Sequence, residues 1–66
     1  MRDPNRLDNF YDEMKKYHQE KLPDWRFGQM MMNFFDWLVR TYKVDPFFPE
    51  EDRMLQWFKE FCEGNV

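Results

Sequence analysis

The stretch that decides the fold is residues 24–42, DWRFGQMMMNFFDWLVRTY. Successive side chains in a helix turn by about 100°, which gathers the large apolar residues of this stretch on one broad face. These residues are Phe27, Met30, Met31, Phe34, Phe35, Trp37, Leu38 and Tyr42. A narrow polar stripe runs beside that face and consists of Gln29, Asn33, Asp36 and Arg40. Because so broad an apolar arc needs cover from more than one direction, we expect it to be the central helix.

Amphipathic helices are predicted on both sides of this stretch. The apolar face of the first consists of Leu7, Phe10, Tyr11, Met14, Tyr17 and His18. That of the last consists of Met54, Leu55, Phe58, Phe61 and Cys62. Asp3 is expected to cap the first helix, Asp24 the second, and Pro49 to start the third. The sequence therefore predicts an all-α, compact three-helix domain over residues 1–66, with helices at roughly 4–21, 24–42 and 50–63.

Two local features predict how these helices pack. Phe47 and Phe48 are too apolar for a free loop, so we expect an aromatic loop, residues 45–49, packed onto the helices before the last one. At least one of the two rings is expected to enter the core. Gly28 costs a helix roughly 1 kcal/mol relative to Ala, so we expect the first helix or the Phe47–Phe48 loop to lie against it.

Length and composition predict where in the cell the protein is located. Cys62 is the only cysteine, so an intrachain disulfide is impossible, and small domains without bridges suit a reducing compartment. Arg2 and Arg6 stand where a signal peptide would need apolar residues. The longest apolar run is far shorter than the roughly 20 residues that span a bilayer. These features predict a cytoplasmic protein without a membrane partner.

The residues that carry chemistry are few. His18 and Cys62 are the only imidazole and thiol ligands, and their spacing gives no support for a metal site, so packing in the core is the expected role of both. Nucleophilic catalysis needs a nucleophile, a base and an orienting group, and so short a chain has little room for a pocket beside its core. We therefore expect no enzyme, no cofactor and no metal.

Three motifs carry a resemblance to known sequences. They are Arg2-Asp3-Pro4-Asn5-Arg6-Leu7, then Pro23-Asp24-Trp25-Arg26-Phe27-Gly28-Gln29, then Asp45-Pro46-Phe47-Phe48 followed by Glu51-Asp52. In this order they resemble a family of short, uncharacterised proteins encoded in bacterial and phage genomes. The resemblance implies no activity, cofactor or catalytic residue. It implies a phage-associated or mobile-element context, in which proteins of this size often bind other proteins.

The charge distribution helps to choose among three possible functions. The net charge of −3 divides into +1 over residues 1–44 and −4 over residues 45–66, without the basic patch that nucleic-acid binders show. The favoured function is a small accessory or regulatory module that binds another protein through an apolar and aromatic surface. A helix-turn-helix-like nucleic-acid-binding protein is one alternative. An acidic inhibitor that competes for a nucleic-acid site through the 50–63 helix is another.

Six residues are the candidates for partner binding: Trp25, Arg26, Gln29, Met32, Val39 and Trp57. Trp25 and Arg26 either form a recognition patch with Gln29, or pack beneath the 22–23 turn and pair with a carboxylate of another helix. Met32 is expected to be exposed beside Val39, with Trp57 or Phe47 completing the surface. The apolar arc of the 24–42 helix also predicts self-association as a homodimer, because two short neighbours leave Met32 and Val39 uncovered.

Overall fold

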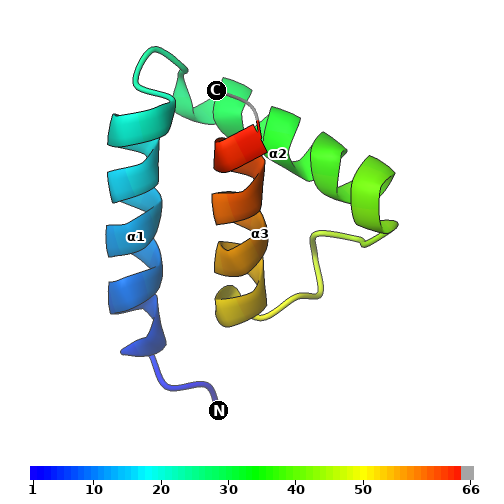
Figure 1. The fold of residues 1–66 in the computed structure, drawn as a ribbon. Coiled ribbons are helices and arrows are strands. Elements are labelled where there is room, and N and C mark those ends of the chain that lie inside the picture. The colour runs from blue at the N-terminus through cyan, green and yellow to red at the C-terminus, as the bar shows by residue number, and fades with distance from the viewer. Residues whose placement is uncertain (65–66) are drawn as a thin grey trace.

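The computed structural model describes residues 1–64, which form three α-helices (Figure 1). They are α1 (Arg6–Lys21), α2 (Phe27–Tyr42) and α3 (Glu51–Gly64). No strand occurs within these residues, and the predicted all-α three-helix domain is confirmed. No helix of residues 1–64 is both long and apolar enough to cross a membrane.

Helices α1 and α3 lie side by side and run in the same direction, while α2 passes behind the upper end of α3 and continues away from α1 (Figure 1). Three ion pairs connect α1 to α3 in the same order along both helices. They are Arg6–Glu51 at 2.6 Å, Glu13–Lys59 at 3.0 Å and Lys21–Glu63 at 3.7 Å. The long connection through α2 makes this parallel arrangement possible, because it returns the chain to the end of the molecule at which α1 begins.

The core is built around α3, which packs closely against both other helices. Its buried residues are Leu55, Phe58, Phe61 and Cys62. The ring of Phe34 on α2 meets those of Phe58 and Phe61, with centroids 5.2 and 5.4 Å away. The expectation that residues 24–42 form the central helix is therefore wrong. Helix α2 fully buries only one row, Met30, Phe34 and Leu38, whereas α3 buries residues toward two neighbours.

The helices begin later than predicted. Asp24 does not cap α2, because the backbone N–H of Trp25 donates to the carbonyl of Leu22 (3.2 Å) and the chain stays in a turn until Arg26. Leu22 is buried, which fixes this turn against the core. At the other end, the carboxylate of Asp3 accepts a hydrogen bond from the N–H of Asn5 (3.0 Å) before α1 starts. Both aspartates therefore belong to turns and not to helix caps.

Three predicted core contacts are wrong. Phe47 and Phe48 are 83% and 72% exposed, so neither ring enters the core. Phe27 is 64% exposed, although it belongs to the predicted buried arc. A Cβ added to Gly28 would meet no atom within 4 Å beyond its own helix backbone and chain neighbours, so nothing in this chain lies against it. The surface therefore exposes three phenylalanine rings, and the backbone at Gly28 is accessible.

Candidate protein-binding face

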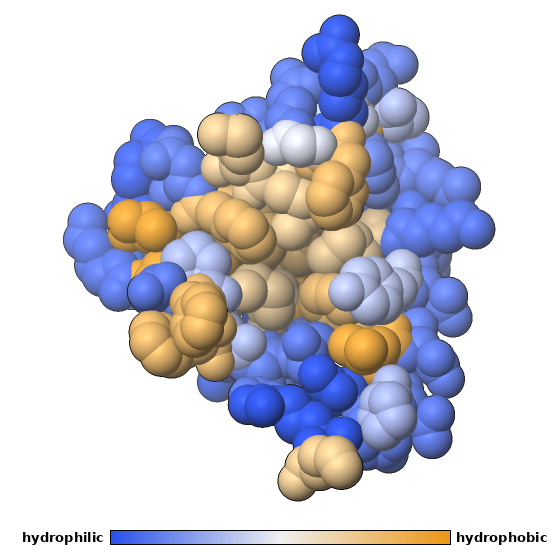
Figure 2. All heavy atoms as spheres, turned by 180° about the vertical axis from the view of Figure 1, so that it is seen from behind, coloured by the Kyte–Doolittle hydropathy of each residue, from blue (hydrophilic) through white to orange (hydrophobic). Residues whose placement is uncertain are grey.

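An apolar groove of about 310 Å³ lies between α1, α2 and the connection that precedes α3. Its lining is almost entirely aromatic, methionine and proline: Phe10, Tyr11, Met14, Phe27, Met31, Phe35, Pro46, Phe47, Pro49, Glu51 and Met54. Glu51 is the one charged residue of this lining, and its carboxylate is paired with Arg6 at 2.6 Å. Figure 2 shows the apolar atoms gathered in a hollow at the middle of one face, with hydrophilic residues around it.

Each wall of the groove comes from a different element. On α2, Phe27, Met31 and Phe35 follow each other at intervals of four residues, which places them in one row along the helix. On α1, Tyr11 is 59% exposed and its ring meets the edge of Phe10 at 5.1 Å. The third wall is Phe47. Rings on three elements thus surround a cleft that no single helix pattern would reveal.

A second apolar row continues this surface around α2. Met32 is 75% and Val39 47% exposed, and they stand three residues before and four residues after Phe35. Pro46 lines both the groove and a neighbouring hollow that includes Val39. We call the exposed surface made by Tyr11, Phe27, Met31, Met32, Phe35, Val39 and Phe47 the apolar face.

The loop that carries Phe47 is held by its own turn. The carboxylate of Asp45 accepts a hydrogen bond from the N–H of Phe47 (3.0 Å), and the carbonyl of Asp45 accepts one from Phe48 (3.3 Å). The two rings pack edge to face on each other at 5.0 Å. Pro46 and Pro49 further restrict the backbone on either side. The rings are therefore exposed on an ordered turn.

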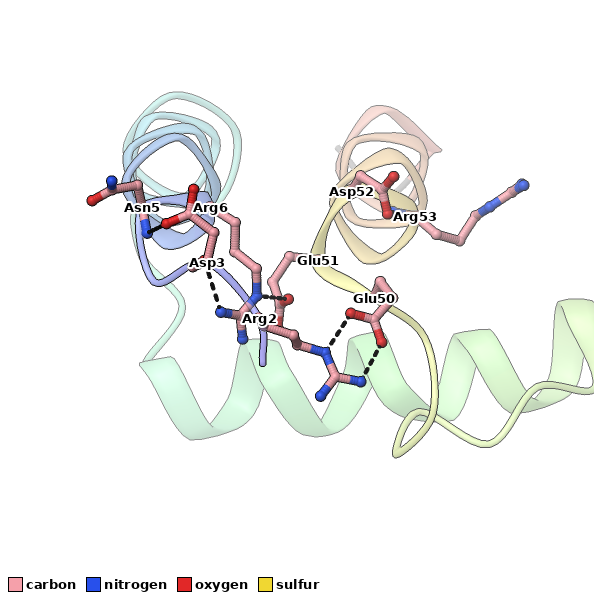
Figure 3. Close-up of polar contacts among 8 residues, drawn as sticks. All are labelled: Arg2, Asp3, Asn5, Arg6, Glu50, Glu51, Asp52 and Arg53. Atoms are coloured by element: carbon pink, nitrogen blue, oxygen red, sulfur yellow. Dashed lines mark hydrogen bonds and ion pairs between the residues drawn. The ribbon is translucent and has the colours of Figure 1, made fainter.

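Ion pairs attach the end of this loop to the start of the chain (Figure 3). The guanidinium of Arg2 donates two hydrogen bonds to the carboxylate of Glu50, each 2.7 Å long. The hydrogen bond from Arg2 is the main cause that lowers the pKa of Glu50. Arg6 binds Glu51 and also donates to the carbonyl of Asp3 (3.1 Å). These contacts fix where the loop meets α3, and with it the position of Phe47 beside the groove.

The six residues predicted for partner binding are not brought together. Met32 and Val39 lie on the apolar face, whereas Gln29 belongs to the polar stripe of α2. Arg26 is exposed at the residue before α2. The indoles of Trp25 and Trp57 pack against the core.

Trp25 and Trp57 both make contacts within the domain. The half-buried Trp25 meets Phe61 edge to face at 6.2 Å, and its carbonyl oxygen lies 2.8 Å from Nε2 of His18. Trp57 stacks on Tyr42 at 5.4 Å, and the guanidinium of Arg53 lies 5.6 Å from its ring. Packing with aromatic neighbours accounts for both indoles.

Four residues of the apolar face were not among the predicted binding residues: Tyr11, Phe27, Met31 and Phe35. Phe47 was expected either at the surface or in the core, and one signal favours the surface. Asp45 and Pro46 precede Phe47, and Pro49 follows it. These residues favour a short, rigid turn that exposes the ring of Phe47. No comparable signal exists for Phe27, because its exposure depends on where α1 passes α2.

The thiol and the imidazole are held within the fold. Cys62 is fully buried, and burial raises the pKa of its thiol to about 11, so the unreactive protonated form dominates near neutral pH. In residues 1–64, no group of three His, Cys, Asp or Glu side chains is placed to hold a metal ion.

Comparison of the chain with protein-family models, with curated proteins and with solved structures finds no match.

Proposed function

We propose that this protein is a small accessory or regulatory module that binds another protein through its apolar face. The observation that carries the proposal is the groove flanked by two exposed rings, Phe27 and Phe47. Contiguous exposed apolar surface of more than a few hundred Å² usually marks an interaction site. We also propose a cytoplasmic location and a mobile-element origin, which is the context that the motif resemblance implies.

The apolar area is large enough for specific recognition. Aromatic side chains offer roughly 200 Å² each, so Tyr11, Phe27 and Phe47, each more than half exposed, present on the order of 400 Å². Met32 and Val39 add to this area. A protein interface of standard size takes about 800 Å² from each partner. The apolar face supplies a hydrophobic centre for such an interface, and the surrounding polar residues supply its rim.

The shape of the groove favours an amphipathic helix as the bound segment. Such a helix offers apolar anchors at intervals of three or four residues and fits clefts between helices. Met14, Met31 and Met54 line the groove, and flexible thioethers adapt to anchors of different shape. Since Glu51 is already neutralised by Arg6, affinity for the segment comes mainly from apolar burial.

Affinity capture with matched variants tests the proposal. The tagged wild type, a groove variant with Phe27→Ser and Phe47→Ser, and a control with Gln19→Ser on the exposed side of α1 are incubated with extract of the natural host. We expect at least one protein to be retained by the wild type and the control but not by the groove variant. Identical retention by all three would contradict binding through the groove.

A further inference from the structure

Helix α2 carries a second apolar row, and all of its residues except Phe35 lie outside both the core and the groove. It consists of Gly28, Met32, Phe35 and Val39, which are spaced 4, 3 and 4 residues apart. This is the heptad spacing with which helices pack side by side along a seam. Gly28, Met32 and Val39 are exposed and Phe35 is half-buried, so the seam has no partner helix within the chain.

We propose that a second copy of this chain packs on the seam, with the two α2 helices antiparallel about a twofold axis. A twofold dimer uses the same surface patch on both copies, so the patch must be complementary to itself. The seam does so, since Gly28 falls opposite Val39 of the second copy and Met32 opposite its Phe35. The inference rests on the proposed protein-binding function, because the seam shares Phe35 with the groove.

The second copy explains why a glycine stands at position 28. Nothing in the chain lies within 4 Å of an added Cβ there, although glycine lowers helix stability by about 1 kcal/mol relative to Ala. A glycine on a seam lets a facing helix approach closely. In the antiparallel arrangement the side chain of Val39 from the other copy fills this space. A parallel arrangement would place Gly28 opposite Gly28 and leave a gap without contacts.

Charge also favours pairing along α2. The helix contains one acid and one base, Asp36 and Arg40, which already pair at 2.9 Å. Two copies therefore meet through a surface without excess charge, although each chain carries −3. Antiparallel helices place the positive end of one dipole beside the negative end of the other.

The area that a stable dimer needs is a small part of the surface of this chain. A standard interface takes about 800 Å² from each partner, roughly a sixth of the 5024 Å² surface of this chain. Antiparallel pairing sets the loop after one α2 beside the start of the other α2. Met32, which is 75% exposed, and Val39, which is 47% exposed, form the apolar centre of that area.

Mass and cross-linking measurements test the second copy and its orientation. Light scattering of the wild type across micromolar concentrations is expected to approach twice the chain mass of 8.5 kDa. Met32→Lys is expected to weaken the association at least about tenfold, because each copy would lose a buried apolar side chain. Asn33→Lys adds the same charge one residue away, on the polar stripe, and should leave the mass unchanged.

Single cysteines report the orientation. In the antiparallel dimer, the two copies of position 32 are offset by about 4.5 Å along the helices and those of position 39 by about 16 Å. A short bifunctional maleimide should therefore link Met32→Cys to itself but not Val39→Cys. The wild type serves as the control, since its buried Cys62 should not react.

Each outcome decides the proposal. Cross-linking at position 32 alone supports it. Cross-linking at position 39, at both positions or at neither position overturns the antiparallel arrangement. A mass of 8.5 kDa at every concentration overturns the second copy altogether. In that case, loss of a captured host protein from the groove variant would still support the proposed function, so the two proposals fail separately.

Discussion

At the residue scale, Gly28 destabilises the helix of the monomer because its backbone is free in the unfolded state. No atom lies within 4 Å of an added Cβ at this position, so no close contact in the monomer requires a glycine. Gly28→Ala is expected to raise the free energy of unfolding by up to about 1 kcal/mol, the full value for a helix interior, because Gly28 lies in the first turn of α2. For a domain of this size, the melting temperature should rise by roughly 4–8 °C per kcal/mol. Thermal melts at low protein concentration, where the monomer dominates, measure this effect.

The control for Gly28→Ala is Gln29→Ala, since Gln and Ala have similar helix propensities and position 29 is also exposed. The midpoint of this control should change little. A lower midpoint for Gly28→Ala at low concentration would show that the monomer has a tight contact at this position. If the proposed dimer forms, the same variant should associate less well than the wild type at high concentration, because the added methyl group would displace Val39 of the second copy.

A second residue-scale prediction concerns the contact between Arg2 and Glu50. The hydrogen bond from Arg2 holds the pKa of Glu50 below its ordinary value of 4.5. The stability that the pair contributes is therefore present above the pKa of the unfolded state and is lost as the pH falls through the lower pKa of the folded state. NMR titration of the Glu50 carboxyl should show its pKa return toward the ordinary value in Arg2→Ala.

The matched stability measurement for this pair compares wild type and Arg2→Ala by denaturant unfolding at neutral and acidic pH. The difference between them should be larger at neutral pH and vanish once Glu50 is protonated in both states. An unchanged pKa of Glu50 in Arg2→Ala would show that the guanidinium does not act on this carboxyl in solution.

At the scale of the elements, two phenylalanines with different surroundings separate the core from the apolar face. Phe34 is fully buried against Phe58 and Phe61, so Phe34→Ala is expected to cost about 3–5 kcal/mol of unfolding free energy. Phe47 is exposed, so Phe47→Ala should change the stability of the monomer by less than about 0.5 kcal/mol. Equal losses in thermal or denaturant unfolding would place Phe47 in the core.

The same elements show which parts of the fold follow from sequence periodicity. The buried row of α3, which includes Leu55, Phe58 and Cys62, recurs at helical spacing and predicts both the helix and its inner face. The start of α2 does not follow, because tertiary burial of Leu22 keeps Asp24 in a turn. Capping preferences are local, and here a long-range contact outweighs them.

The apolar face is predictable only in part for a related reason. Met32 and Val39 stand at the edge of the apolar arc, so periodicity alone predicts their exposure. Phe27 stands inside that arc, and its exposure depends on the crossing of α1 and α2, whose backbones are nowhere in close contact. Helical periodicity identifies apolar faces, but the three-dimensional arrangement decides which of them remain uncovered.

At the scale of the whole molecule, the distribution of charge predicts no meaningful affinity for duplex DNA. Within residues 1–64, five basic side chains form ion pairs with acids, among them Lys59 with Glu13 and Arg2 with Glu50. Helix α3 begins with the acids Glu51 and Asp52. Non-specific DNA binding depends on clustered Lys and Arg that release counterions. A gel shift at low micromolar protein that persists in physiological salt would contradict this prediction and favour the nucleic-acid-binding alternative.

We propose that α2 faces the core on one side and a second copy of the chain on the adjacent side. Three consecutive methionines report on these sides, since Met30 is 1% exposed, Met31 is half-buried and Met32 is 75% exposed. The most direct test is methyl NMR of these residues with a soluble paramagnetic agent over a concentration series. We predict that the Met32 signal is broadened strongly in dilute protein and protected as the concentration rises, while Met30 stays protected throughout. A Met32 signal that remains equally broadened at every concentration would contradict the account.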